Sequence, residues 1–203
     1  MKQAEINKES YNSIISDWNS YRNKTTINNC IKEFCKSLPK HAHILDIGCG
    51  TGYPIDSFLC QSGFSIVGID ISDKMIANAK KRHLSNAIFI EKDFLYFTST
   101  EKFDAIIAFD SIWHIEESQQ EKIYKMVSSL LNPNGYFLFT HGKNAGTIVG
   151  NMFSHEFIYS ALGSKKVKSI LNENSMDIIF YQEDYEEKTT GKRDLLIIAK
   201  KRN

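Results

Sequence analysis

Three glycines at alternate positions follow a short apolar run, and they are the residues of this chain with the clearest chemical meaning. Gly48, Gly50 and Gly52 belong to the segment Ile-Leu-Asp-Ile-Gly-Cys-Gly-Thr-Gly-Tyr-Pro, residues 44–54. Because glycine lacks a Cβ atom, its backbone adopts positive φ angles and lets a ligand approach to van der Waals distance. A strand that ends in such a turn before a helix indicates a nucleoside cofactor site. The cofactor that fits this turn therefore determines what the chain does.

The spacing of the glycines narrows the choice of cofactor. Dinucleotide binding favours Gly-x-Gly-x-x-Gly, in which the third glycine lets the helix pack closely. Here Tyr53 occupies that third position. A P-loop is excluded more firmly, because no Gly-Lys-Ser or Gly-Lys-Thr follows to hold phosphate and magnesium. The turn therefore argues against triphosphate chemistry and fits a dinucleotide poorly.

Three aspartates accompany the turn. Asp70 closes the next apolar run, 18 residues after Gly52, where a carboxylate can accept both ribose hydroxyls; alternatively it caps the helix that starts at Ser72. Asp46 precedes the first glycine and can receive a cationic amino group. Asp93 follows the third apolar run and can receive the exocyclic amine of adenine. A cationic amino-acid nucleoside fits these acids better than a diphosphate does.

The elements that must position these residues follow a simple alternation. From Ile44 onward, β-branched or aromatic runs alternate with amphipathic stretches, which is typical of an α/β fold with a parallel sheet covered on both faces. We expect strands at residues 43–47, 64–69, 87–91, 103–109, 135–141, 177–183 and 195–200, the last two forming an antiparallel hairpin at the sheet edge. Helices are expected after Pro54, from Ser72 or Asp73, over about 116–131 and from Gly163 to about Glu173.

Two segments fall outside this alternation. Residues 1–38 contain two helical stretches, which we expect to form a cap over the sheet edge or the cofactor. From Gly142 to Ser154 the chain holds three glycines and little periodicity, which predicts a mobile loop. The region 142–160 is long enough to act as an acceptor-site lid. With no internal repeat and no linker, residues 1–203 are expected to form a single domain.

Composition limits the partners and the compartment. Lys and Arg number 25 against 24 Asp and Glu, a balance that creates no field to gather nucleic acid or an anionic membrane. The four cysteines form no Cys-x-x-Cys pair, so we expect reduced thiols in a cytoplasmic protein. No apolar run approaches the roughly 18 residues that span a bilayer. No His-Glu-x-x-His occurs, and we predict no metal site.

The motifs together resemble one family. Asp46-Ile-Gly48-Cys-Gly50-Thr-Gly52, Asp70, Asp93 and Phe103-Asp104-Ala105-Ile106-Ile107 follow, in order, the motifs of class I S-adenosylmethionine-dependent methyltransferases of the small-molecule type. The resemblance extends from about Tyr11 to Lys200. It implies a Rossmann-like, doubly wound, seven-stranded sheet of order 3-2-1-4-5-7-6 with the last strand antiparallel. It also implies S-adenosylmethionine as cofactor and in-line transfer of a methyl group to a small-molecule acceptor.

The same resemblance implies a set of cofactor contacts. The backbone from Gly48 to Gly52, with Cys49 and Thr51 between the glycines, lies against the methionine part of the cofactor. Asp70 holds the ribose, and Ile71 packs on the adenine. The adenine is read by Asp93 and Phe94. Met75 either contacts the adenine or belongs to the core. Trp18, with Tyr11 and Arg22, is similar to the cofactor-covering segment of the family; alternatively Tyr11 and Trp18 form only an apolar stripe.

The segment after the fourth strand reads Phe109-Asp110-Ser111-Ile112-Trp113-His114 and lies at the topological switch point of such a sheet. The resemblance implies cofactor contacts for Phe109, Asp110 and Ser111. His114 has a suitable intrinsic pKa for a general base; alternatively it hydrogen-bonds the cofactor or the backbone, or positions the acceptor. The segment lacks the Asn-Pro-Pro-Tyr motif of family members that methylate bases, which argues against a nucleic-acid acceptor.

Four residues at or beyond the end of the fifth strand are candidates for an acceptor pocket: His141, His155, Phe157 and Tyr159. Aromatic groups beside a loop favour an apolar or ring-bearing small molecule, although they also anchor loops without a ligand.

Two other functions are compatible with parts of the sequence. One is an NAD(P)-dependent oxidoreductase, against which stand Tyr53 in the glycine pattern and the absence of a Tyr-x-x-x-Lys pair. The other is a non-catalytic protein that binds a nucleoside cofactor.

Overall fold

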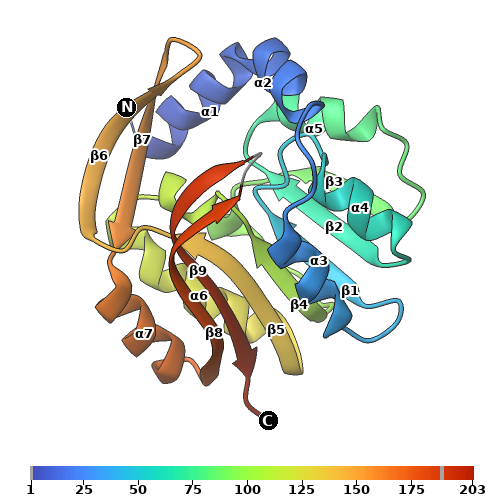
Figure 1. Ribbon diagram of the computed structural model, residues 1–203, viewed down its shortest axis with the longest axis vertical. Coiled ribbons are helices and arrows are strands. Elements are labelled where there is room, and N and C mark those ends of the chain that lie inside the picture. The colour runs from blue at the N-terminus through green and yellow to red at the C-terminus, as the bar shows by residue number, and fades with distance from the viewer. Residues whose placement is uncertain (1, 188–189) are drawn as a thin grey trace.

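A seven-stranded sheet with helices on both faces forms the centre of the molecule, and a two-stranded sheet lies beside it (Figure 1). The computed structural model describes residues 2–187 and 190–203. The α-helices are α1 Gln3–Ser13, α2 Ile15–Arg22, α3 Asn29–Lys36, α4 Ile55–Gln61, α5 Asp73–Lys80, α6 Glu117–Leu130 and α7 Ser164–Glu173. Two 3-10 helices are η1 Phe94–Tyr96 and η2 Ile112–His114. The strands are β1 His43–Ile47, β2 Ser65–Asp70, β3 Ala87–Glu91, β4 Phe103–Ala108, β5 Leu131–His141, β6 Ala145–Met152, β7 His155–Leu162, β8 Met176–Glu187 and β9 Gly191–Lys201.

The order of the central sheet is β3-β2-β1-β4-β5-β9-β8. Strands β1 to β5 are parallel to their neighbours within this group, and β9 is antiparallel to both β5 and β8. The labels differ from the predicted order only because the additional hairpin takes the numbers β6 and β7. Without that hairpin the order is 3-2-1-4-5-7-6 with the last strand antiparallel, so the predicted fold is confirmed.

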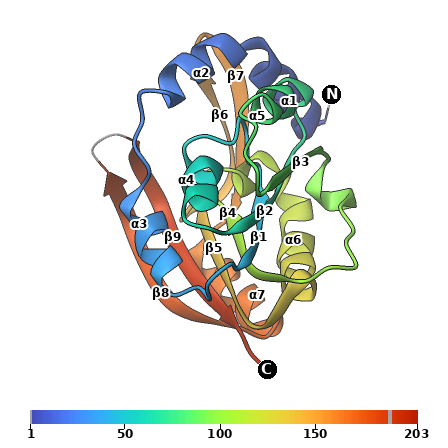
Figure 2. The same cartoon turned by 90° about the vertical axis from the view of Figure 1, so that its right-hand side faces the viewer.

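Both faces of the sheet are buried along its middle strands, which explains why those strands are apolar at successive positions, whereas the edge strands β3 and β8 are partly exposed. Ile44 and Leu45 point to opposite faces of β1, and neither is exposed to solvent. Helices α3 and α4 cover the first face, and α6 and α7 cover the second, as Figure 2 shows from the side of α4. Burying each such side chain contributes about 1.5–3 kcal/mol.

The region between Gly142 and Ser154 is not the loop predicted from sequence. It contains β6, which pairs along its whole length with β7 in an antiparallel hairpin. The prediction was wrong because most of β6 is exposed, so its residues need not alternate between apolar and polar. Gly146 and Gly150 weaken the sequence signal for a strand further, because glycine is uncommon in strands.

Side chains of α1 hold the hairpin in place. Asn7 Nδ2 donates to the carbonyl oxygen of Ile158 at 2.8 Å, and the Ile158 amide donates to Asn7 Oδ1 at 2.9 Å. Ser10 Oγ donates to the carbonyl oxygen of Glu156 at 2.6 Å. These bonds satisfy main-chain groups of β7, which would otherwise be costly to bury. Helix α1 therefore replaces a neighbouring strand on this side of β7, and α1 and α2 lie together over one end of the central sheet (Figures 1 and 2).

The carboxyl ends of β1, β2 and β4 meet beneath α1 and α2. In the parallel register Ile47 is level with Ile69, and Asp46 is level with Ile107. Helix α5 starts immediately after β2, and its N-cap is Ser72, whose Oγ accepts a hydrogen bond from the Met75 amide at 3.0 Å. Ligands of open α/β sheets bind at such an edge.

Candidate active site

A cavity of about 340 Å³ lies at this edge, between the strand ends and the two N-terminal helices. Its volume is at the low end of the range for small-molecule sites, about 300–1,000 Å³. Its lining includes the following residues predicted to bind cofactor: Trp18, Asp46, Gly48, Cys49, Gly50, Thr51, Asp70, Ile71, Met75, Asp93, Phe94, Phe109, Asp110 and Ser111. Tyr11, Arg22 and His114 also line it. The topology thus brings together residues from six separate segments of the chain.

The three glycines of the turn have different roles. All have positive φ angles: +78° at Gly48, +56° at Gly50 and +70° at Gly52. A Cβ atom on Gly48 would lie 2.4 Å from Ser111 Cβ, and one on Gly52 would lie 3.0 Å from the Phe89 ring. A Cβ atom on Gly50 would meet only Trp18 Nε1, at 3.8 Å. The outer glycines therefore permit packing within the protein, and Gly50 is the one that leaves room for a ligand.

Asp70 is held by the main chain on both sides. Its Oδ2 accepts from the Gly50 amide at 2.9 Å and its Oδ1 from the Ser72 amide at 2.8 Å. Burial raises the pKa of Asp70 to about 6, although these two hydrogen bonds oppose the rise. The carboxylate thus ties β2 to the glycine turn, and its remaining lone pairs are available to hydroxyl donors.

Asp93 occupies the corresponding place after β3. Its side chain accepts from the Leu95 amide at 2.9 Å and caps η1, whose first residue, Phe94, is buried. Met75 is both buried in α5 and part of the cavity lining, so the two interpretations of this residue are compatible.

Arg22 places a half-buried cation in the cavity wall. Its Nε donates to the carbonyl oxygen of Tyr53 at 3.3 Å, and its guanidinium lies over the Trp18 ring, 5.4 Å from the centroid. Burial lowers the pKa of Arg22, and the charge of Asp110 opposes this. A cation that makes so few hydrogen bonds is suited to an anionic group of a ligand.

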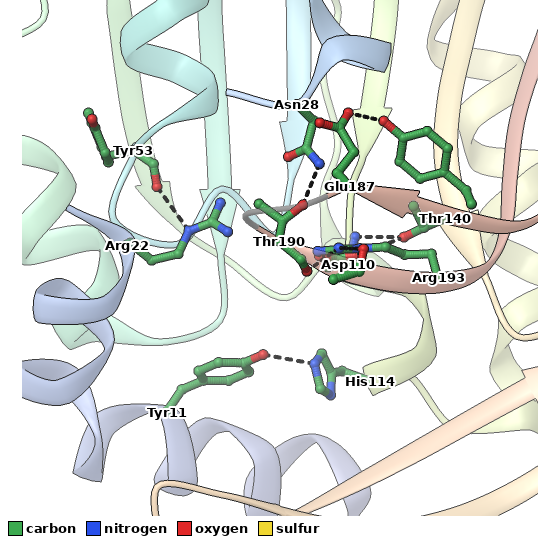
Figure 3. Close-up of polar contacts among 12 residues, drawn as sticks. Tyr11, Arg22, Asn28, Tyr53, Asp110, His114, Thr140, Glu187, Thr190 and Arg193 are labelled. Carbon is green, nitrogen blue, oxygen red and sulfur yellow. Dashed lines mark hydrogen bonds and ion pairs between the residues drawn. The ribbon is translucent and has the colours of Figure 1, made fainter. Parts of the chain in front are cut away.

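Arg193, near the beginning of β9, holds the switch-point segment in place (Figure 3). Asp110 has a positive φ of 59°, and its carboxylate accepts from Arg193 Nε at 2.9 Å and from Arg193 Nη2. The Asp110 amide donates to Thr140 Oγ1 at 2.8 Å. Sequence reasoning did not identify Arg193, because 83 positions separate it from Asp110 and no motif surrounds it.

Ser111 follows directly and has an unused hydroxyl. Its Oγ is buried without a hydrogen-bond partner among the residues that the structure describes, and the same holds for Thr51 Oγ1. Both residues line the cavity. Buried hydroxyls without partners are uncommon in native proteins, and here they indicate that a polar ligand completes the site.

His114 is engaged through both ring nitrogens. Nε2 lies 2.9 Å from Tyr11 Oη (Figure 3). Nδ1 lies 3.2 Å from Asn7 Nδ2. Burial lowers the pKa of His114 to about 4, so the ring is neutral at physiological pH. Burial also raises the pKa of Tyr11 well above its usual value. This arrangement favours a positioning role for His114 over that of a base.

The residues predicted to form an acceptor pocket lie outside the cavity lining. His141 is buried and hydrogen-bonds Gln120 Oε1 and the carbonyl oxygen of Gly142. His155 is near the tip of the β6–β7 hairpin, and Phe157 is packed against Tyr11. Tyr159 packs against His114 from the same strand. Phe157 and Tyr159 thus pack behind Tyr11 and His114 of the cavity wall, whereas His141 lies in the interior and His155 lies beside the hairpin turn. Gly52 is likewise absent from the lining because it faces Phe89.

Known proteins that this chain resembles in sequence include several that are methyltransferases by name. A family described as a methyltransferase domain matches residues 44–135. The Bacillus subtilis protein YqeM, a methyltransferase by name, is 34% identical over 108 residues, which cover 51% of this chain and 43% of YqeM. A ubiquinone biosynthesis O-methyltransferase of Pelagibacter ubique is 30% identical over 152 residues, or 71% of this chain and 62% of that enzyme. These matches support a class I S-adenosylmethionine-dependent methyltransferase.

Solved structures of methyltransferases share the fold. Magnesium protoporphyrin IX methyltransferase of Synechocystis, with S-adenosylmethionine bound, superposes with a TM-score of 0.75 at 17% identity and covers 99% of this chain and 98% of that one. A methyltransferase of Methanosarcina mazei gives a TM-score of 0.70 at 22% identity, covering 88% of this chain and 99% of that one. The chain spans less than two thirds of the curated relatives named above.

The described part of this methyltransferase-family chain contains no helix long and apolar enough to cross a membrane. Across residues 2–187 and 190–203, no group of three or more His, Cys, Asp or Glu side chains is arranged to hold a metal ion.

We predict that replacing Arg193 by Met lowers the free energy of unfolding by about 3 kcal/mol, because it leaves Asp110 charged and unpaired in a largely buried place. Urea unfolding measures this loss. Arg202→Met is the matched control: Arg202 pairs with Asp177 at the surface, so its loss costs about 1 kcal/mol or less. Equal losses in the two variants would contradict the structural role of Arg193.

Proposed function

We propose that this chain is an enzyme that transfers a methyl group from S-adenosylmethionine to a small-molecule acceptor by in-line displacement. The observation that carries the proposal is the cavity around Gly50, which is lined by an open backbone, by Asp46, Asp70 and Asp93, and by two hydroxyls that have no partner among the described residues. The similarity to solved methyltransferases with S-adenosylmethionine or S-adenosylhomocysteine bound supports the same cofactor. When bound, S-adenosylmethionine supplies a methyl group on a positively charged sulfur.

The residues present fit the parts of this cofactor. Asp70 would hold the ribose hydroxyls, and Asp93 with Phe94 would read the adenine. Arg22 would pair with the carboxylate of the methionine part, and Asp46 with its amino group. The Ser111 and Thr51 hydroxyls supply donors beside the glycine turn, where the structure leaves them without partners. Each part of the cofactor would thus meet a side chain or main-chain group of matching polarity.

The dimensions of the cavity support a small acceptor. Its volume is about 340 Å³ and α1 and α2 cover it, so little room remains once a nucleoside occupies it. Excluding water in this way also strengthens the electrostatic interactions inside. Positioning an acceptor about 3–3.5 Å from the reacting carbon supplies much of the rate in such a displacement. Tyr11 and His114, which are hydrogen-bonded to each other, would form the wall that orients the acceptor.

Calorimetry with three ligands tests the cofactor. We expect binding of S-adenosylmethionine and S-adenosylhomocysteine, and no measurable binding of NAD, because Tyr53 stands where a dinucleotide turn has its third glycine. Tighter binding of NAD would overturn the proposed function in favour of an oxidoreductase.

Gly50→Val is expected to weaken S-adenosylmethionine binding about 100-fold or more, equivalent to about 2.8 kcal/mol. The valine would fill the space toward Trp18, and its backbone would be strained at a φ of +56°. Gly146→Val is the control, because Gly146 also has a positive φ, but a Cβ atom there would meet no other atom within 4 Å on the exposed hairpin. Calorimetry measures the affinity of both variants for S-adenosylmethionine. Their melting temperatures separate an effect on stability from an effect on binding. Unchanged affinity in Gly50→Val would show that the turn is not the site.

His114 is expected to remain neutral until the pH falls well below 6. Its folded-state pKa of about 4 lies below the ordinary value of 6.5. The unfolded chain therefore takes up the proton first, and stability is lost as the pH falls from about 6.5 to about 4. The loss is about 3 kcal/mol more in the wild type than in His114→Gln. Urea unfolding across this range measures the difference, and imidazole NMR signals give the pKa directly. Titration of His114 near neutral pH would contradict this and favour a general base.

A further inference from the structure

The hydrogen-bond partners of His114 decide which of its ring nitrogens carries the hydrogen. Both partners come from α1: Asn7, which is 2% exposed, and Tyr11, which lines the cavity as His114 does. Nδ1 of the ring lies 3.2 Å from Asn7 Nδ2, and Nε2 lies 2.9 Å from Tyr11 Oη. A neutral imidazole has a hydrogen on one nitrogen and a lone pair on the other, so a donor beside one nitrogen places the hydrogen on the other.

The main chain of β7 sets the orientation of the Asn7 amide. The Ile158 amide donates to Asn7 Oδ1 at 2.9 Å, and Asn7 Nδ2 donates to the Ile158 carbonyl oxygen at 2.8 Å. Turning the amide over would bring donor against donor and acceptor against acceptor, so these two bonds fix the assignment. The second hydrogen on Nδ2 faces His114, whose carbonyl oxygen is 3.3 Å away. Nδ1 of His114 therefore meets a hydrogen-bond donor and acts as an acceptor.

A hydrogen on Nδ1 would have no free acceptor among the residues that the structure describes. The carbonyl oxygen of Ile158 is the main-chain acceptor beside the ring. It already accepts from Asn7 Nδ2 at 2.8 Å and from Gln3 Nε2 at 3.3 Å, which occupies both of its lone pairs. Burial lowers the pKa of His114 to about 4, so a ring with hydrogens on both nitrogens is not populated near neutral pH. The single hydrogen is therefore on Nε2.

This tautomer determines what the Tyr11 hydroxyl can do. His114 Nε2 donates to Tyr11 Oη, so the hydroxyl oxygen is the acceptor in the bond that Figure 3 shows. Within residues 2–187 and 190–203, Oη has no hydrogen-bond partner other than His114. The hydrogen of the hydroxyl group is thus not used by the protein. Because Tyr11 lines the cavity, this hydrogen is available to a molecule bound there.

We propose that Asn7 is a positioning residue: by holding His114 with its hydrogen on Nε2, it makes the Tyr11 hydroxyl a hydrogen-bond donor to the methyl acceptor. The acceptor is then a small molecule that presents an unprotonated oxygen, such as that of a carbonyl or carboxylate group, to Tyr11. This inference rests on the proposed function, because it takes the molecule beside Tyr11 to be the acceptor. Asn7 acts only through His114 and Tyr11.

The arrangement selects among acceptors by the direction of one hydrogen bond. An oxygen lone pair placed beside Tyr11 completes the series of donors that begins at Asn7. An ammonium group in the same place would bring its own hydrogens against that of the hydroxyl group. A buried donor without an acceptor costs about 1–3 kcal/mol, so the wall disfavours a cationic group at this point.

Nitrogen-15 NMR of the free protein tests the tautomer directly. The ring signals of His114, assigned by their absence in His114→Gln, should show a hydrogen on Nε2 and none on Nδ1. In Asn7→Asp the carboxylate accepts from Nδ1, so the hydrogen should move to Nδ1. Asn172→Asp is the matched control, because Asn172 is exposed on α7 and its Oδ1 accepts from Arg202, as an aspartate would; it should retain the wild-type signals. A hydrogen on Nδ1 in the wild type would overturn the inference.

A pair of small probes tests the direction of the Tyr11 hydroxyl. Acetone and isopropanol have similar shapes, but acetone only accepts hydrogen bonds whereas isopropanol also donates. Shifts of the Tyr11 ring signals during titration give the affinity for each probe. In Asn7→Asp the hydroxyl donates to His114 Nε2 and can only accept from a ligand. The affinity for acetone relative to isopropanol should therefore fall about fivefold, as expected for the loss of one hydrogen bond. An unchanged ratio, or no binding of either probe near Tyr11 in the wild type, would overturn the inference.

Asn7→Ala provides a second variant if Asn7→Asp does not fold. It removes the donor beside Nδ1 without adding a charge, so His114 should become a mixture of both tautomers. A ring that keeps its hydrogen on Nε2 alone in Asn7→Ala would show that Asn7 does not set the tautomer. Calorimetry with S-adenosylmethionine tests the proposed function separately. No binding there would overturn that function, whereas binding together with a hydrogen on Nδ1 in the wild type would overturn only this inference.

Discussion

The close approach of two parallel strand ends is the constraint on which the site depends. Gly48, just after β1, packs so tightly against Ser111, just after β4, that a Cβ atom on Gly48 would lie 2.4 Å from Ser111 Cβ. This contact brings the glycine turn and the switch-point segment to opposite sides of one cavity. Since β1 and β4 are neighbours in the sheet, their parallel register carries the turn and the segment to the same edge. Any larger residue at position 48 would separate them.

Bringing these ends together places acids where solvent is excluded. Asp46, Asp56 and Asp70 are held beside one another by β1, α4 and β2, and burial disfavours their charged forms. Such an arrangement costs stability. At Asp110 the fold offsets this cost, because Arg193 pairs with the carboxylate. The site thus contains one acid that the protein itself neutralises beside others whose charge burial penalises.

The sequence predicted the sheet well, because its middle strands are apolar on both faces and local turn chemistry marks their ends. It also indicated residues that line the cavity, since Gly50, Asp70 and Asp93 each lie within a few residues of a strand end. It could not predict Arg193, which reaches Asp110 from a strand distant in the chain. It also missed β6, since an exposed strand need not show the alternation that reveals a half-buried one. The hairpin buries Phe157 against Tyr11, a contact that the sequence pattern did not reveal.

The roof of the cavity, formed by α1 and α2, and its floor, formed by the sheet, are held by different interactions. The floor is apolar sheet, but α1 meets β7 through Asn7 and Ser10, whose side chains satisfy main-chain groups of the strand. Hydrogen bonds of this kind contribute about 0.5–1.5 kcal/mol each, less than the burial of a large apolar side chain. Because each of these hydrogen bonds requires a particular geometry, they fix the positions of Tyr11 and His114. Their contribution to the stability of α1 is small by comparison. The position of the Tyr11–His114 wall therefore depends on polar contacts between α1 and the hairpin, and changes in β7 would shift that wall without disturbing the glycine turn beneath it.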